Sequence, residues 1–157
     1  MDLSSLQRHC RGAMAQPGDP AFASMVHGNL WNRLLQERGP ELVVRVENEQ
    51  DVIAVLRFAR EQGRKVVVRG GGHHWCHPTL RQGGILIDLS CLNQVLKIDP
   101  AARTAIVQPV VSNRELLAAL QPFGLAYPSG HCPQVKVSVY LLSGGMAWNQ
   151  EVREPRV

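Results

Sequence analysis

The 157-residue chain lacks any apolar run near the roughly 20 residues that a membrane-spanning helix needs. Residues 1–15 are polar and carry no apolar core of a secretory signal. Internal repeats and low-complexity segments are also missing. With 45% hydrophobic and 19% charged residues, the composition is that of a globular chain that buries a core, which excludes the disordered and fibrous classes. We therefore expect a cytoplasmic protein that does not contact a membrane.

Cysteine is scarce and shows no short paired spacing. The four cysteines are Cys10, Cys76, Cys91 and Cys132, an arrangement that argues against a disulfide scaffold in a chain of this size, so free thiols are expected. A stripe of basic residues is absent as well, because lysine and arginine are scattered along the sequence. The net charge of +4 favours an anionic ligand, but this scatter argues against a nucleic-acid partner.

The most informative feature is a strand that runs into three glycines and two histidines. Valines 66–68 and Arg69 lead directly into Gly70–Gly72, His73 and His74. Glycines let the backbone approach a ligand closely, and consecutive N–H groups form a concave anion site. No Lys-Ser/Thr pair follows, so this is not a P-loop, and the spacing differs from that of a dinucleotide-binding turn. The order predicts a cofactor phosphate with a reactive imidazole beside it.

A βαβ unit carries this glycine run. Residues 42–46 predict a strand, Asn48 predicts the cap of a helix that Gly63 ends, and residues 65–69 predict a second strand parallel to the first. Regular structure is expected to begin at Glu41. Residues 1–40 are interpreted as a lead-in, with a turn at 16–20 and a short helical or irregular stretch at 31–36.

The second half of the chain predicts a hairpin, a helix and a loop. Strands are predicted at 85–89, 95–98 and 104–107, the last two joined by a hairpin loop at 99–103. Ser112 and Glu115 form a capping box that predicts a helix ending at Gly124. Residues 127–133 predict a loop, and 135–142 predict an extended run before another glycine pair.

The motifs occur in an order that resembles a known family. They are Arg69-Gly-Gly-Gly-His73, Ile87-Asp88-Leu89-Ser90, Gly130-His-Cys132-Pro-Gln-Val135 and Ser143-Gly144-Gly145. Over residues 16–150, this set resembles the FAD-binding domain of the berberine-bridge-enzyme-like oxidases, of the vanillyl-alcohol-oxidase or PCMH type. The resemblance implies an α+β fold, with a βαβ first subdomain and an incomplete second α/β subdomain within residues 41–150. Residues 151–157 are left as an unmatched tail.

The resemblance also implies a covalently bound FAD. His73 holds the position of the histidine that bonds to the flavin 8α carbon, a role that suits the nucleophilic neutral imidazole. Cys132 matches the cysteine that bonds to flavin C6. The thiolate is the species that forms this bond, and nearby loop N–H groups and His131 would lower the pKa of the Cys132 thiol. Arg69 and Gly70–Gly72 would bring main-chain N–H donors to the pyrophosphate. The implied cofactor-binding residues are Arg69, Gly70, Gly71, Gly72, His73, His74, Gly130, Cys132, Val135, Ser143, Gly144 and Gly145.

The implied activity is that of a flavin-dependent oxidoreductase. In a complete relative, the flavin takes a hydride from an alcohol, sugar or alkaloid-like small molecule and passes electrons to dioxygen. This chain carries no counterpart of the substrate domain, so we interpret it as an N-terminal fragment, a truncated oxidase with no catalytic residue assigned. Such a fragment is expected to expose apolar sheet surface. Whether another chain supplies the missing half is left open.

Plainer interpretations stand beside these assignments. His73 could be an ordinary turn histidine, Cys132 an inert buried thiol, and residues 144–145 a simple turn. Asp88 is expected to cap N–H groups at a strand end and not to act as a base. A different class is a non-catalytic zinc module, whose ligands would come from His73, His74, Cys76, His77, His131 and Cys132. The sequence also departs from the family at Lys136, Ser138 and Val139, where glycines are usual near the flavin.

Overall fold

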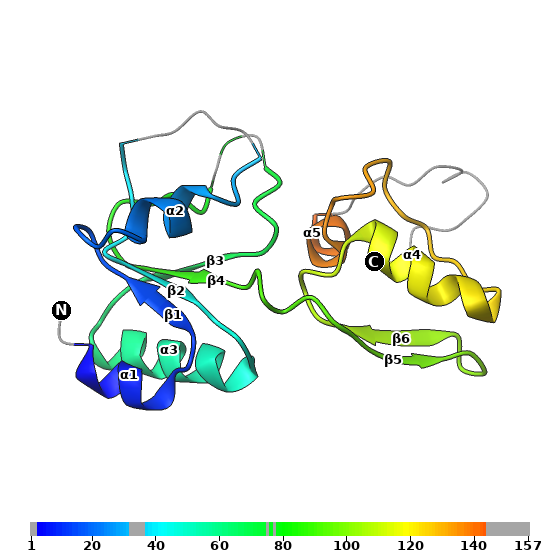
Figure 1. The fold of residues 1–157 in the computed structure, drawn as a ribbon, viewed down its shortest axis with the longest axis horizontal. Helices are drawn as coiled ribbons and strands as arrows, with labels where there is room; N and C mark the ends of the chain where they lie inside the picture. Colours follow the sequence, from blue (N-terminus) through cyan, green and yellow to red (C-terminus); the bar gives the residue numbers. More distant parts are fainter. Residues whose placement is uncertain (1–2, 32–36, 75, 77, 144–157) are drawn as a thin grey trace. The chain divides into compact units, whose positions relative to one another are not determined.

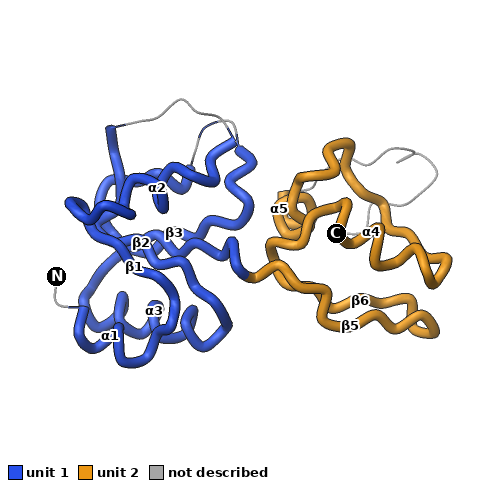
Figure 2. The backbone as a smooth tube through the Cα atoms, in the orientation of Figure 1, with its two compact units in different colours: residues 1–91 blue, residues 92–157 orange. Residues whose placement is uncertain are grey.

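A computed structural model describes residues 3–31, 37–74, 76 and 78–143. The chain divides into two compact units, residues 1–91 and 92–157 (Figure 2). None of the helices within the described residues is long and apolar enough to span a membrane.

The first unit is a four-stranded sheet with helices on both faces (Figure 1). Its strands are β1 (Ala13–Ala15), β2 (Leu42–Arg45), β3 (Val66–Arg69) and β4 (Ile85–Asp88), in the spatial order β1-β2-β4-β3. Strand β1 is antiparallel to β2, and the other neighbours are parallel. Helix α2 (Phe22–His27) covers one face, whereas α1 (Ser4–His9) and α3 (Glu49–Glu61) cover the other.

The predicted βαβ unit is confirmed. Strands β2 and β3 are parallel in one sheet, but β4 lies between them and pairs with both. Both faces of the central strands are covered, and so three successive residues of β2 and all of β4 are buried. Helix α3 begins as predicted, because the Asn48 side chain accepts a hydrogen bond from the Asp51 N–H at 3.0 Å. Gly63 follows the helix with φ +60°.

The expectation that regular structure begins at Glu41 is wrong. Helix α1, strand β1 and helix α2 all precede it, and Ala15 of β1 pairs with Val43 of β2. Met25 and Val26 of α2 belong to the core on that face of the sheet. These elements have only three to six residues, too few to show a clear hydrophobic period, and they are stabilised by packing on the sheet. Residues 32–36, part of the predicted 31–36 stretch, lie outside the described residues.

The buried Cys10 follows the last residue of α1 and lies close to Asp51 in the first turn of α3. Burial raises the pKa of this thiol from 9.0 to about 11, the Gly12 N–H lowers it in part, and the negative charge of Asp51 adds to the rise. Asp51 is itself buried and accepts hydrogen bonds from the backbone N–H groups of Arg11 and Glu47, both at 2.9 Å. This cluster joins the N-terminal segment to α3.

The Cys10 environment predicts a slow thiol. Because the thiolate is the reactive species, we expect folded Cys10 to resist iodoacetamide near neutral pH while the exposed Cys76 and Cys91 react. The pKa of Cys10 is higher in the folded chain than in the unfolded chain, so protonation of this thiol contributes to the free energy of unfolding. This contribution is fully present below pH 9.0 and is lost as the pH rises towards 11. Peptide-resolved alkylation with and without urea measures the reaction rate of each thiol. Equal rates for Cys10 and Cys91 in the folded chain would contradict it.

The second unit is a hairpin packed against helices. Strands β5 (Val95–Asp99) and β6 (Thr104–Val107) are antiparallel, which confirms the predicted hairpin. Helix α4 (Asn113–Leu120) has the predicted Ser112–Glu115 capping box, and a 3-10 turn, η1 (Gln121–Phe123), continues it to Gly124. The pKa of Glu115 is lowered because it accepts hydrogen bonds from the Ser112 side chain and backbone N–H. The core of this unit is formed by Val111, Leu116, Leu120 and Val137.

The predicted extended run at 135–142 is wrong. Residues Val137–Leu142 form helix α5, and only the stretch before it is extended, where Lys136 bridges Ser112. Alternating valines at 135, 137 and 139 favour a strand by propensity. Packing overrides this preference, because Val137 is 2% exposed in the core and its N–H donates to the Val111 carbonyl at 2.8 Å.

The hairpin exposes apolar side chains, as the sequence predicts for its sheet surface. Leu96 is 52% and Ile106 56% exposed. A groove of about 950 Å³ lies between β6, α4, α5 and the segment 124–128, and its lining includes Val107, Leu116 and Tyr127. The second unit therefore presents two exposed apolar side chains on its hairpin and a groove with both polar and apolar lining.

Polar substitution on this face is expected to improve solubility. Leu96→Thr together with Ile106→Thr should reduce self-association, because it removes exposed apolar area and places threonine, which favours strands, at both positions. The free energy of unfolding should change by less than about 0.5 kcal/mol. Val107→Thr is the matched control, since Val107 packs against the core, and it should destabilise the chain by about 1–2 kcal/mol. Sedimentation and urea unfolding test both, and unchanged self-association in the double variant would contradict the prediction.

Candidate functional site

The glycine run leaves the sheet where three parallel strands end. Strands β2, β4 and β3 finish in register, with Arg45 opposite Asp88 and Asp88 opposite Arg69. The carboxyl edge of a parallel sheet is where ligands of such folds bind. Gly70, Gly71, Gly72 and His73 are all partly accessible there, and His74 is exposed.

The side chain of Arg69 is committed to the protein. It is 1% exposed, and its Nη2 lies 3.0 Å from Asp88 Oδ2. Its guanidinium also donates to the carbonyl of Met25 at 2.6 Å and to that of Val26, both in α2. Any contact of Arg69 with a cofactor would therefore be made by its main chain, as the sequence predicts.

Asp88 has the capping role predicted for it and a larger one. Its Oδ1 accepts from the Ser90 N–H at 3.0 Å, which is the expected cap. Its Oδ2 also lies 3.3 Å from Arg45 Nε, so Asp88 bridges two arginines from the neighbouring strand ends. Only the parallel register of the strands brings these charges together.

Gly72 packs directly against the segment that follows α2. Its φ is +67°, and a Cβ at this position would lie 1.9 Å from the Asn29 carbonyl oxygen. The Trp31 N–H donates to the Gly72 carbonyl at 3.2 Å. No other residue type fits at this position without movement of the backbone.

His73 lies beside an aromatic ring from the same N-terminal segment. The ring centroids of Trp31 and His73 are 5.2 Å apart and the planes are tilted by 40°. The next residue, His74, accepts a hydrogen bond from the Cys76 N–H through Nδ1 at 3.0 Å. His73 thus has an aromatic neighbour and is only partly accessible, whereas His74 is exposed and occupied within the turn. Trp75 and His77 lie outside the described residues.

The Cys132 loop lies on the first turn of α4. The Asn113 side-chain Nδ2 donates to the Cys132 carbonyl at 3.1 Å, and the Asn113 and Arg114 N–H groups donate to the carbonyls of Val135 at 2.9 Å and Pro133 at 3.0 Å. Cys132 is a free, half-buried thiol. The fold thus presents Cys132 on a loop that is tied to a helix at three points.

The remaining predicted residues lie around this loop or outside the described part. A Cβ on Gly130 would lie 3.1 Å from the Tyr140 ring, so the loop runs close to α5. Ser143 is exposed just after α5, and its N–H donates to the Val139 carbonyl at 3.1 Å. Gly144 and Gly145 lie outside the described residues. Lys136 and Val139, which depart from the family pattern, belong to the start and the interior of helix α5.

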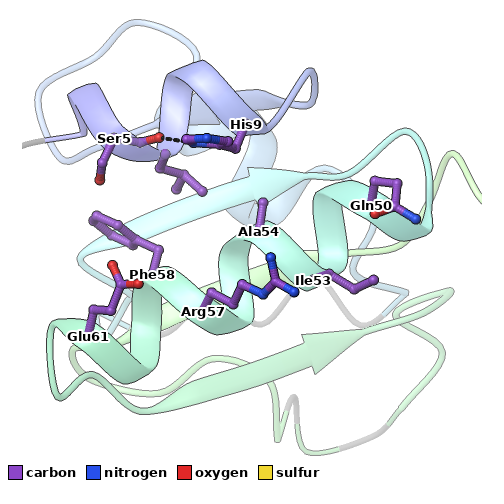
Figure 3. Close-up of a pocket in the computed structure, with 9 residues that line it drawn as sticks. Ser5, His9, Gln50, Ile53, Ala54, Arg57, Phe58 and Glu61 are labelled. Carbon is purple, nitrogen blue, oxygen red and sulfur yellow. Dashed lines mark hydrogen bonds between the residues drawn. The ribbon is translucent and has the colours of Figure 1, made fainter.

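Two further observations concern other sites. Within the part of the chain that the structure describes, no three His, Cys, Asp or Glu side chains group so that they could hold a metal ion. A separate hollow of about 330 Å³ lies between α1 and α3, where the Ser5 carbonyl is 2.9 Å from His9 Nδ1 (Figure 3). It is lined by residues such as Arg57, Phe58 and Glu61, and no predicted site residue belongs to it.

Sequence reasoning missed the partners of both loops. Asn29 and Trp31 contact the glycine run across about forty residues of sequence, and nothing local in residues 21–31 indicates this. Asn113 was not recognised because it lies within the capping-box segment, where a polar residue is expected at any helix start. Its 1% exposure is what distinguishes it.

Comparison with known proteins places the chain among flavoproteins. It is 30% identical over 138 residues to (R)-6-hydroxynicotine oxidase of Paenarthrobacter nicotinovorans. The aligned stretch covers 88% of this chain and 29% of that protein. The crystal structure of 6-hydroxy-D-nicotine oxidase from Arthrobacter nicotinovorans superimposes with a TM-score of 0.81 at 28% identity, over 96% of this chain and 32% of that one. Wild-type BBE-like 1 of Physcomitrella patens gives a TM-score of 0.81 at 26% identity, over 99% of this chain and 33% of that one.

The chain therefore spans about a third of the length of these relatives. A family model described as an FAD binding domain matches residues 40–155, a range that includes most of the segment 151–157. The predicted α+β FAD-binding fold is confirmed by this match and by the structural similarity. The domain boundaries at 41 and 150 stay predictions. The chain belongs to the FAD binding domain family of FAD-linked oxidoreductases.

Proposed function

We propose that this chain is the FAD-holding part of a flavin-dependent oxidase in which His73 and Cys132 bond covalently to the cofactor. The observation that carries the proposal is the half-buried His73, which the glycine run presents at the carboxyl edge of a parallel sheet, within an FAD binding domain. The glycine run fits a phosphate-bearing cofactor, because Gly70–Gly72 carry no side chains and their main chain is partly accessible at this edge.

Each residue has a separate task. The main chain of Arg69–Gly72 would approach the pyrophosphate, because the Arg69 side chain is occupied elsewhere. His73 would supply a ring nitrogen for the bond to the flavin 8α carbon, and Cys132 a thiolate for the bond to C6. In each attachment a flavin C–H and the residue's N–H or S–H are replaced by the new bond. For each bond formed, two electrons and two protons would pass to one dioxygen, giving hydrogen peroxide.

The substrate is proposed only by class. FAD, when bound, supplies the redox chemistry and accepts a hydride from substrate. We assign an alcohol, a sugar or a related small molecule as substrate and dioxygen as electron acceptor. The relatives named above are a nicotine-derivative oxidase and a BBE-like protein, and this chain covers a third of their length. The residues that hold the substrate would come from a further domain or from another chain.

Intact mass spectrometry of the denatured protein tests the proposal directly. After incubation with FAD, the chain should carry a covalent FAD adduct and keep flavin absorbance after denaturation. His73→Ala and Cys132→Ala should each retain an adduct, and the double variant should lose it. Folding of each variant is checked by urea unfolding. A colourless chain without adduct would rule out the attachment, and a colourless chain with stoichiometric zinc would favour the zinc-module alternative.

A further inference from the structure

A buried amide connects helix α4 to the Cys132 loop. Asn113 is the first residue of α4 and is 1% exposed. Burial of an amide costs free energy unless its donor and acceptor both have partners. Here Nδ2 donates to the Cys132 carbonyl at 3.1 Å, and Oδ1 accepts from the Tyr127 hydroxyl. The side chain thus bonds to both ends of the loop 127–132, at Tyr127 and at Cys132.

The helix does not need this side chain as a cap. Ser112 already caps α4, since its hydroxyl accepts from the Glu115 N–H at 3.2 Å and the Glu115 carboxylate accepts from the Ser112 N–H at 2.7 Å. The Asn113 amide points instead to the loop. Its burial is therefore explained by the loop that it holds.

The Cys132 carbonyl sets the orientation of the Asn113 amide, because a carbonyl can only accept a hydrogen bond. Burial, and then the nearby Tyr140, raise the pKa of the Tyr127 hydroxyl to about 12, so it stays a protonated donor throughout the neutral range. With the amide nitrogen directed at the Cys132 carbonyl, the amide oxygen faces Tyr127 and accepts from its hydroxyl. The reverse orientation would place the amide oxygen against the Cys132 carbonyl, so it does not satisfy both partners.

We infer that Asn113 is a positioning residue for Cys132. Its Nδ2 bond fixes the main chain at Cys132, and so fixes the direction in which the thiol leaves the loop. This role rests on the proposed function, in which Cys132 bonds to the flavin. The backbone bonds from Asn113 and Arg114 to Val135 and Pro133 hold the loop on α4. Within the loop, the Val135 N–H also donates to the Cys132 carbonyl at 3.2 Å, so the Nδ2 bond is the one that connects residue 132 to the helix.

Asn113→Asp is the decisive variant. It keeps the shape and the Oδ1 acceptor for Tyr127, and a carboxylate in the first turn is favourable to the helix. It replaces the donor to Cys132 with an oxygen that repels the carbonyl. In the flavin-free chain, we expect the iodoacetamide rate of Cys132 to rise about threefold to tenfold, the effect of one lost hydrogen bond. After FAD incubation, the fraction of chains bonded at Cys132 should fall by a similar factor, while the fraction bonded at His73 stays unchanged.

Two controls separate positioning from folding. Tyr127→Phe removes the other amide partner and leaves the Nδ2 bond, so it should change the Cys132 alkylation rate by less than about twofold. Asn113→Ser, whose side chain is too short for either partner, replaces Asn113→Asp if that variant fails to fold. Peptide-resolved mass spectrometry reads alkylation and both adducts, and urea unfolding reports stability.

The outcomes are distinct for the two proposals. An unchanged Cys132 alkylation rate in folded Asn113→Asp would overturn the positioning role. Equal loss of the His73 and Cys132 adducts would also overturn it, because it indicates a general structural effect. Altered alkylation without any Cys132 adduct in the unsubstituted chain would support the role of Asn113 and reject Cys132 as an attachment point.

Discussion

Gly72→Ala is expected to lower the free energy of unfolding by about 3 kcal/mol and to abolish FAD binding. The new Cβ would meet the Asn29 carbonyl oxygen at 1.9 Å, and that neighbour is backbone, which cannot rotate away. The φ of +67° adds strain for any residue with a side chain. The glycine run and the segment after α2 would have to separate, which would also displace His73 from Trp31.

Gly63→Ala is the matched control for this prediction. Gly63 has a similar φ of +60° in the same unit, but a Cβ there meets nothing within 4 Å. Gly63→Ala should therefore cost only the conformational term, about 1 kcal/mol, and leave FAD binding intact. Urea unfolding and flavin titration measure both variants. If the two alanine variants prove equally stable and bind FAD equally, close packing at Gly72 does not support the site.

Asp88→Asn should destabilise the chain by about 3–5 kcal/mol, the second large effect. Asp88 is fully buried and bridges Arg69 at 3.0 Å and Arg45 at 3.3 Å. The substitution keeps the shape of the side chain but leaves the guanidinium of Arg69 buried without its counter-charge. Because Arg69 immediately precedes the glycine run, we also expect weaker FAD binding.

The exposed ion pair of the same unit provides the control. Arg64 and Glu41 lie 2.9 Å apart, but both side chains are 43% exposed. Glu41→Gln should therefore cost less than about 1 kcal/mol, because water screens this pair. The contrast is measured by urea unfolding of the two variants. A loss below 1 kcal/mol for Asp88→Asn would mean that the buried network does not stabilise the sheet edge.

Local signals in the sequence predicted part of the fold well. Asn48 and the Ser112–Glu115 pair mark helix starts through contacts within three residues, and both are present in the structure. The hairpin of β5 and β6 follows from two strands with a short loop between them. Helix α5 was predicted wrongly, because the β-branched residues at 135–139 favour a strand and only packing around Val137 decides for a helix.

The candidate site divides in the same way. Its predicted chemistry is local, because the glycines and His73 stand in one short motif that indicates a phosphate with an imidazole beside it, and the role of Cys132 is implied by the resemblance of its own short motif. Its support is not local. Asn29 lies against Gly72, and Asn113 bonds to Cys132, across gaps that no periodicity spans.

By itself, the sequence determined the family and predicted the attachment residues, since both depend on which residue types follow one another along the chain. The tertiary structure alone decided that the Arg69 side chain faces Asp88 and α2, because the parallel register brings the strand ends together. It also decided that residues 3–31 belong to the first unit, since elements this short are stable only when packed on the sheet.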